Sequence, residues 1–207
     1  EVKEVRPLKA VLKDAKAIDA ILDKGYAKQK VKPLPLVDDA TFVRRAYLQL
    51  GGRIPTYGET VGFIENKDPL KHAALVDRIL DSEAYDSHTF NWWADLLRIQ
   101  SPSRSGGANN VGGGVSYALW MMEKIQQNTP FDEIARKLIT AKGYPWNNGA
   151  VGYYMRDAGM PLDNMSNTTQ VFLGTQMVCA QCHNHPFDKW TQMEYYQMAA
   201  YTYGVQA

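Results

Sequence analysis

Apolar residues recur at intervals of three and four along most of this chain, and this spacing limits its fold more than any other feature. Between residues 8 and 29, for example, it places Leu12, Ile18 and Leu22 on one face of a helix. We find no segment that alternates apolar and polar residues as a half-buried strand does. The sequence therefore predicts an all-α fold, a bundle of several helices.

Capping and breaking residues divide this pattern into separate helices. Asp38 or Asp39 can cap a helix that reaches about Leu50 and stops at Gly51-Gly52. Thr56, with Glu59 three residues on, has the form of a capping box at the start of a short helix. Further helices are expected over 68–81, over an aromatic-rich stretch at 83–99, over 115–127 and 131–142, from Asp163 or Asn164 up to the cysteines, and from Thr191 onward.

Length and composition fit a soluble globular protein. The chain has 207 residues, of which 45% are hydrophobic and 22% charged, enough to bury one substantial core. We expect a single α-helical domain over residues 1–207, with a candidate seam in the glycine- and serine-rich stretch 101–114. The formal charge of +1 gives no reason to expect nucleic acid as a partner, and no apolar run is long enough for a membrane span.

The two cysteines of the chain both stand in the pentapeptide Cys179-Ala180-Gln181-Cys182-His183. Two cysteines separated by two residues and followed at once by histidine form the pattern of covalent haem c attachment. Each thiol adds to one vinyl group of the haem, and the histidine supplies an axial ligand to the iron. The C-terminal segment is thus predicted to hold one haem c through Cys179 and Cys182, with His183 as the axial ligand.

Three other interpretations of the pentapeptide are less favoured. A thioredoxin-like redox pair opens a helix after a strand, and nothing like a strand precedes Cys179. A zinc site made of Cys179, Cys182, His183 and His185 would pack four ligands into seven residues. A disulfide across a two-residue gap would be strained and easily reduced.

The ligand on the other side of the iron decides between electron transfer and small-molecule chemistry. Met160 is the candidate sixth ligand, because Gly159-Met160-Pro161 fixes a methionine in a turn-rich loop. The alternatives are Met165, Met155 or Met198, or an open or water-bound position. The haem-pocket candidates are four residues shortly after the cysteines, namely His185, Phe187, Trp190 and Tyr196.

Several segments together resemble a family of unknown function. Residues 172–174 and 179–192, including the stretch from Cys179 to Trp190, look like the end of the domain of unknown function 1549, which is found with planctomycete-type cytochromes c. Similar matches occur at 39–45, 50–56, 93–98 and 130–132. Members are secreted or periplasmic proteins of planctomycetes, verrucomicrobia and related bacteria. The resemblance implies electron transfer or haem-linked redox chemistry, without a defined substrate.

The favoured function is that of a monohaem c-type electron-transfer domain, an electron carrier in preference to a catalyst. One alternative is a haem enzyme or small-ligand-binding protein with an open distal site, in the manner of a peroxidase. Another is a structural or interaction module whose fold the bound haem stabilises. Attachment of haem c takes place outside the cytoplasm, so we expect a periplasmic or extracellular protein with an export signal, redox proteins as partners, and a longer multidomain chain around this one.

Overall fold

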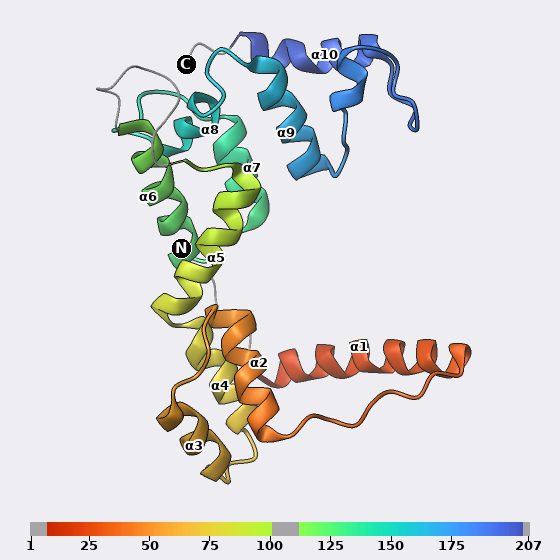
Figure 1. Ribbon diagram of the computed structural model, residues 1–207, viewed down its shortest axis with the longest axis vertical. Coiled ribbons are helices and arrows are strands. Elements are labelled where there is room, and N and C mark those ends of the chain that lie inside the picture. Colours follow the sequence, from red (N-terminus) through yellow and green to blue (C-terminus); the bar gives the residue numbers. More distant parts are fainter. Residues whose placement is uncertain (1–7, 101–111, 205–207) are drawn as a thin grey trace.

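Helices form all the regular structure that the computed structural model describes, which covers residues 8–100 and 112–204 (Figure 1). The α-helices are α1 (Leu8–Gln29), α2 (Asp39–Gly51), α3 (Tyr57–Glu65), α4 (Lys71–Leu80), α5 (Glu83–Leu97), α6 (Gly112–Gln126), α7 (Phe131–Ile139), α8 (Gly152–Met155), α9 (Pro161–Leu173) and α10 (Gln192–Tyr203). Two short 3₁₀ turns, η1 (Gly149–Val151) and η2 (Val178–Gln181), lie among them. The all-α prediction is confirmed for these ranges. The expected seam at 101–114 falls mostly on residues outside them.

The capping residues recognised in the sequence begin and end α2 and α3 as predicted. The Asp38 side chain accepts a hydrogen bond from the backbone N–H of Thr41 at 2.7 Å, and Gly52 ends α2 in the left-handed region with φ of 64°. At the start of α3, Thr56 and Glu59 form both halves of a capping box.

Three helices begin elsewhere than the sequence suggested, and α9 ends at Leu173 instead of reaching the cysteines. One of the three is α6, which starts at Gly112 instead of residue 115. α4 starts at Lys71, because the Asp68 carboxylate accepts from the backbone N–H of Leu70 and thereby closes a turn before the helix. α9 starts at Pro161, two residues before the expected cap, since proline lacks the N–H that the first helical position leaves unpaired. α5 ends earlier than expected, where Arg98 adopts a φ of 53°.

Three apolar clusters hold the described helices together, and α5 belongs to the packing of two of them. Its first half packs on α2 and α4, whereas its second half packs on α6 and α9. The cluster between α2, α3 and α4 contains Val43, Ala46, Tyr47, Phe63, Leu75 and Ile79. The central cluster contains Trp93, Leu97, Tyr117, Met121, Ile125, Ile134, Leu138, Ala150 and Tyr153. The adjacent Trp92 is 58% exposed, whereas Trp93 is buried.

Two glycines let η1 and α8 lie directly against α6. A Cβ atom at Gly149 would overlap the carbonyl oxygen of Ser116, and one at Gly152 would overlap the Cβ of Tyr117. Only a residue without a side chain permits this approach. The segment that leads into α9 is thereby fixed against the central cluster.

α1 projects away from the rest of the molecule (Figure 1). The apolar stripe predicted from its sequence is present but exposed, with Ile18 at 58% and Ile21 at 69% exposure. None of its residues joins an apolar cluster of the described chain. Among the described helices, α1 included, none is both long and apolar enough to cross a membrane.

Candidate functional site

The two cysteines lie on and just after η2, and their backbone suits attachment of a common group. Cys179 is inside this 3₁₀ turn, and Cys182 ends it with helical dihedral angles. Side chains three residues apart lie above one another on a 3₁₀ turn. Both thiols are free and exposed. The local fold therefore presents two unbonded, exposed thiols at a short turn.

Apolar packing beneath η2 holds this turn against the body of the protein. Ala180, between the cysteines, is fully buried and belongs to a third cluster with residues of α9 and α10. The cluster contains Met165, Met177, Ala180, Tyr195 and Ala199, with Leu162, Trp190 and Met198 packed around it. The residue between the thiols is thus the anchor, while the thiols face outward.

Hydrogen bonds from the start of α10 fix the backbone on either side of Cys182. The carbonyl oxygen of Gln181 accepts from the Tyr196 hydroxyl at 3.2 Å and from Nε2 of Gln192 at 3.0 Å. The side-chain oxygen of Asn184 accepts from the backbone N–H of Gln192 at 3.0 Å. The start of α10 is itself set by the capping box that Thr191 forms with the third helical residue. The predicted cap at Thr191 therefore also positions the cysteine segment.

His183 is held in a form that can bind a metal. Its Nδ1 lies 2.6 Å from the backbone carbonyl oxygen of Asn184. A carbonyl oxygen only accepts hydrogen bonds, so the proton of the neutral imidazole is assigned to Nδ1. Nε2 then carries a lone pair, and the ring is exposed. A second hydrogen bond of this kind is what orients histidine ligands in metal sites.

The four haem-pocket candidates lie in different surroundings. His185 and Trp190 are half-buried and joined by a backbone hydrogen bond of 2.8 Å. Nδ1 of His185 accepts from the backbone N–H of Phe187. Tyr196 contacts the segment through the bond to Gln181 described above, whereas the Phe187 ring is 94% exposed. Three of the four thus support the cysteine segment, and Phe187 is presented to solvent.

Met160 does not pack with the cysteine segment in the described structure. It is the N-cap residue of α9, where its backbone bonds to Asp157 and Asn164. The methionines that lie beneath the motif are Met165 and Met177, both buried in the third cluster. The sequence could not separate these methionines, because only the packing of η2 on α9 decides which of them lies near the thiols.

A hollow of about 550 Å³ borders η2 between α5 and α9. It reaches Val178, the residue before Cys179, and its apolar wall includes Leu96 and Val171. Arg98 contributes a side chain that is 42% exposed. These residues are far apart in sequence from the cysteines, so no local motif indicated that they would meet.

Within residues 8–100 and 112–204, no three His, Cys, Asp or Glu side chains gather as a metal-binding group. The set considered for zinc, at positions 179, 182, 183 and 185, is consequently not assembled there. A group attached through the two thiols requires only one further ligand from the protein, and His183 can provide it.

The structure thus defines an all-α protein whose C-terminal segment presents two free thiols next to a histidine. Residues 17–207 match the model of PSCyt2, a protein of unknown function (DUF1549), and the chain belongs to this family. The family resemblance noted from the sequence is confirmed to that extent. Comparison with curated proteins gave no match, and comparison with solved structures gave none either.

Proposed function

We propose that this chain carries one covalent haem c and serves as a monohaem electron-transfer domain in the periplasm or outside the cell. The observation that carries the proposal is the combination of two free, exposed thiols, on and just after one 3₁₀ turn, with the His183 ring bonded through Nδ1. Thiol spacing, thiol accessibility and the histidine tautomer are each what haem c attachment requires.

The residues around the motif would each do part of the work of holding the group. When bound, haem supplies reversible one-electron chemistry at its iron. Cys179 and Cys182 would hold the haem through two thioether links, and Nε2 of His183 would bind its iron. The bond from Nδ1 to the Asn184 carbonyl oxygen keeps the ring oriented, with the lone pair of Nε2 available to a metal. Because Ala180 is anchored in the third cluster, the side chains of Cys179, Cys182 and His183 would keep fixed positions relative to one another.

The hollow beside η2 offers surroundings suited to a large planar group. Leu96, Val171 and Val178 supply apolar surface. Arg98 pairs with Asp157 and adds a positive charge that attracts a carboxylate, while Asp95 and Asp163 add negative charge to the same lining. Arginine is suited to carboxylates because its planar fork can donate two parallel hydrogen bonds. We infer that these residues contribute to the haem environment.

The position of Met160 favours a second candidate function, a haem protein with an open sixth position that binds small ligands. Met160 caps α9 apart from the motif, and Met165 and Met177 are buried in apolar packing. An iron without a second strong protein ligand can bind oxygen, peroxide or carbon monoxide. In the electron carrier, by contrast, a methionine would have to reach the iron.

The test is production of the chain in the periplasm of a host that matures c-type cytochromes, followed by a reduced pyridine haemochrome spectrum. We expect c-type bands in the unmodified protein and none when Cys179 and Cys182 are both replaced by alanine. His183→Gly should keep the bands but change the spectrum of the native iron, with recovery on addition of imidazole. His72→Gly, at an exposed position of α4 where the ring contacts Asp39 of α2, is the control and should leave the native spectrum unchanged.

The rate at which the protein binds carbon monoxide distinguishes the two candidate functions. An electron carrier with a methionine ligand should bind carbon monoxide slowly, and Met160→Ala should make binding fast. Fast binding to the unmodified protein, unchanged by Met160→Ala, would favour the ligand-binding protein. Absence of c-type bands from the soluble, folded protein would contradict both candidates.

A further inference from the structure

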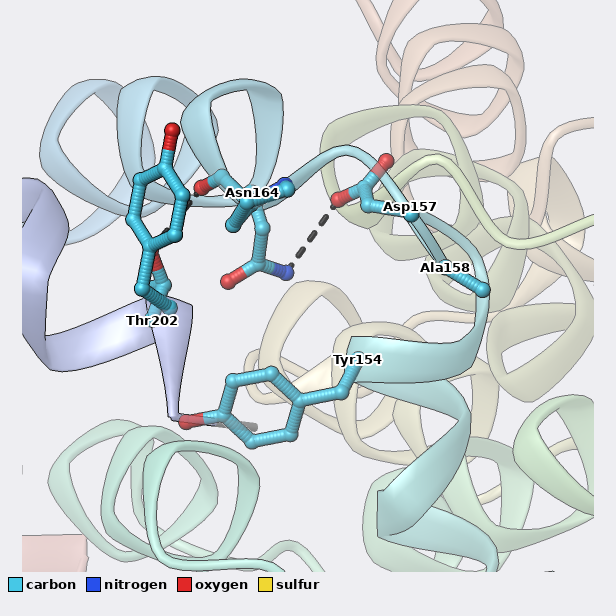
Figure 2. A pocket seen from close by; sticks show the side chains of 8 residues that line it. Tyr154, Asp157, Ala158, Asn164 and Thr202 are labelled. Atoms are coloured by element: carbon cyan, nitrogen blue, oxygen red, sulfur yellow. Dashed lines mark hydrogen bonds between the residues drawn. The ribbon is translucent and has the colours of Figure 1, made fainter. Parts of the chain in front are cut away.

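A second pocket lies where the start of α9 meets the end of α10. It has a volume of about 220 Å³ and is bordered by Tyr154, Asp157, Asn164, Thr202 and Tyr203, among others (Figure 2). None of its lining residues belongs to the cysteine motif or to the hollow beside η2. An inference about this pocket is therefore independent of the haem proposal.

Asn164 presents an unpaired acceptor to this pocket. The residue is 3% exposed, and its Nδ2 donates to the carbonyl oxygen of Tyr153 and to Oδ2 of Asp157, both at 3.2 Å. Reversal of the amide would place an oxygen against two acceptors, so this orientation is fixed. Oδ1 has no donor within the described part of the chain. Figure 2 shows it directed into the space between Thr202 and Tyr154.

The hydroxyl groups of Tyr154 and Thr202 use their protons within the protein. Tyr154 donates to the carbonyl oxygen of Ile139 at 2.6 Å, and Thr202 donates to that of Pro161 at 2.9 Å. Their oxygens, like Oδ1 of Asn164, are left only with lone pairs for a further bond. A ligand that satisfies this pocket must consequently bring hydrogen-bond donors.

The charges behind the pocket favour a neutral ligand. Asp157 is paired with two guanidinium groups, those of Arg98 at 3.0 Å and Arg156 at 2.8 Å. The excess positive charge of this cluster opposes a cation, and the acceptors that face the pocket oppose an anion. The rings of Tyr154 and Tyr203 add apolar surface of the kind common in small-molecule sites.

We propose that this pocket binds one neutral polyol about the size of a monosaccharide. One hydroxyl group of the ligand donates to Oδ1 of Asn164, and the tyrosine rings cover its C–H faces. A ligand without hydroxyl protons leaves the buried Asn164 acceptor unpaired and is rejected for that reason.

The experiment is titration of the ¹⁵N-labelled full chain with D-glucose and myo-inositol, followed by NMR. We expect at least one of them to shift the Asn164 side-chain amide and the Tyr203 backbone amide in a saturable manner. The dissociation constant should be about millimolar, as expected for a ligand with about a dozen heavy atoms. D-glucosamine, D-glucuronate and fully O-methylated glucose should each bind at least about tenfold more weakly, because they add a charge or remove the donors.

Ala158 gives a variant that blocks the pocket and keeps the Asn164 hydrogen bonds. It lines the pocket but takes no part in those bonds. Ala158→Phe should abolish the saturable shifts, whereas Ala200→Phe, at an exposed position of α10 outside this pocket, should preserve them. Two results would overturn the proposal: no saturable shift with either polyol, which indicates a pocket filled by water, or undiminished binding by a folded Ala158→Phe protein.

Discussion

At the scale of single residues, the buried guanidinium of Arg156 is the strongest link between distant parts of the chain. Its Nε donates to Asp157, one Nη to the carbonyl oxygen of Leu97 and the other to Asn167. It also lies over the Tyr153 ring, 4.4 Å from the ring centre. One side chain thereby joins the end of α5 to α8 and α9, and α9 borders both the hollow at η2 and the pocket at Asn164.

Removal of the Asp157 carboxylate should lower the free energy of unfolding strongly. Asp157→Ala leaves the buried Arg156 without its countercharge, and we expect a loss of about 3–5 kcal/mol in the free energy of unfolding. Arg98→Ala removes a partner that is 42% exposed and should cost about 1 kcal/mol or less. Urea unfolding of each variant measures the change in the free energy of unfolding. Equal losses would show that Arg156 does not depend on the carboxylate.

Glu59 should make stability depend on pH in the acidic range. Arg53 and the backbone of Thr56 hold the pKa of this carboxyl well below its usual value. A carboxyl with a lowered pKa stabilises the fold above its unfolded pKa of about 4.3 and loses this effect as the pH falls. Between about pH 5 and 3 the wild type should therefore lose up to about 1 kcal/mol more than Glu59→Gln, since the pair is partly exposed. Parallel urea denaturation curves across this range would contradict the expectation.

At the scale of elements, helix ends show which structure the sequence makes predictable. Asp38, Thr56 and Thr191 act within three residues of themselves, so their caps could be recognised from local sequence alone. The close approach of Gly152 to α6 depends on residues far away in the chain and had no local signal. The same holds for the functional site. The thiol spacing was visible in the sequence, but the bond from His183 to Asn184 and the hollow lined by Leu96 were not.

Substitution of the packed glycine tests how closely α8 and α6 approach. Gly152→Ala should lower the free energy of unfolding by about 1–3 kcal/mol, because the added methyl group overlaps Tyr117. Gly62 provides the matched control, since it lies within α3 and a Cβ there meets no atom within 4 Å. Gly62→Ala should raise stability by about 0.5–1 kcal/mol through its better helix propensity. A neutral Gly152→Ala would show that the two elements lie further apart.

At the scale of the whole molecule, α5 connects the α2–α4 cluster to the central cluster, and α1 stands outside both. The periodic apolar residues of α1 correctly predicted a helix. They could not predict burial, because an amphipathic pattern specifies a face and not what covers it. Helix formation was therefore readable from the sequence, whereas the arrangement of the helices around α5 required the structure.

Deletion of residues 1–29 should leave the rest of the fold intact. The side chains of α1 from Val11 onward are exposed and contribute nothing to the three clusters. We expect the thermal midpoint to change by less than about 2 °C, the shift that corresponds to a small fraction of the stability of a domain this size. Differential scanning calorimetry measures it. A fall of more than about 4 °C would mean that α1 packs on the remaining helices.

The central claim is that Cys179 and Cys182 together hold one haem, and the mass of the matured protein tests it most directly. The intact chain from a host that attaches haem c should be heavier by one haem, and digestion should place the whole increase on the peptide that contains residues 179–183. The mass should survive acid–acetone extraction, because thioether links are covalent. A folded protein whose mass equals that of the bare chain, with both thiols open to alkylation, would contradict the account.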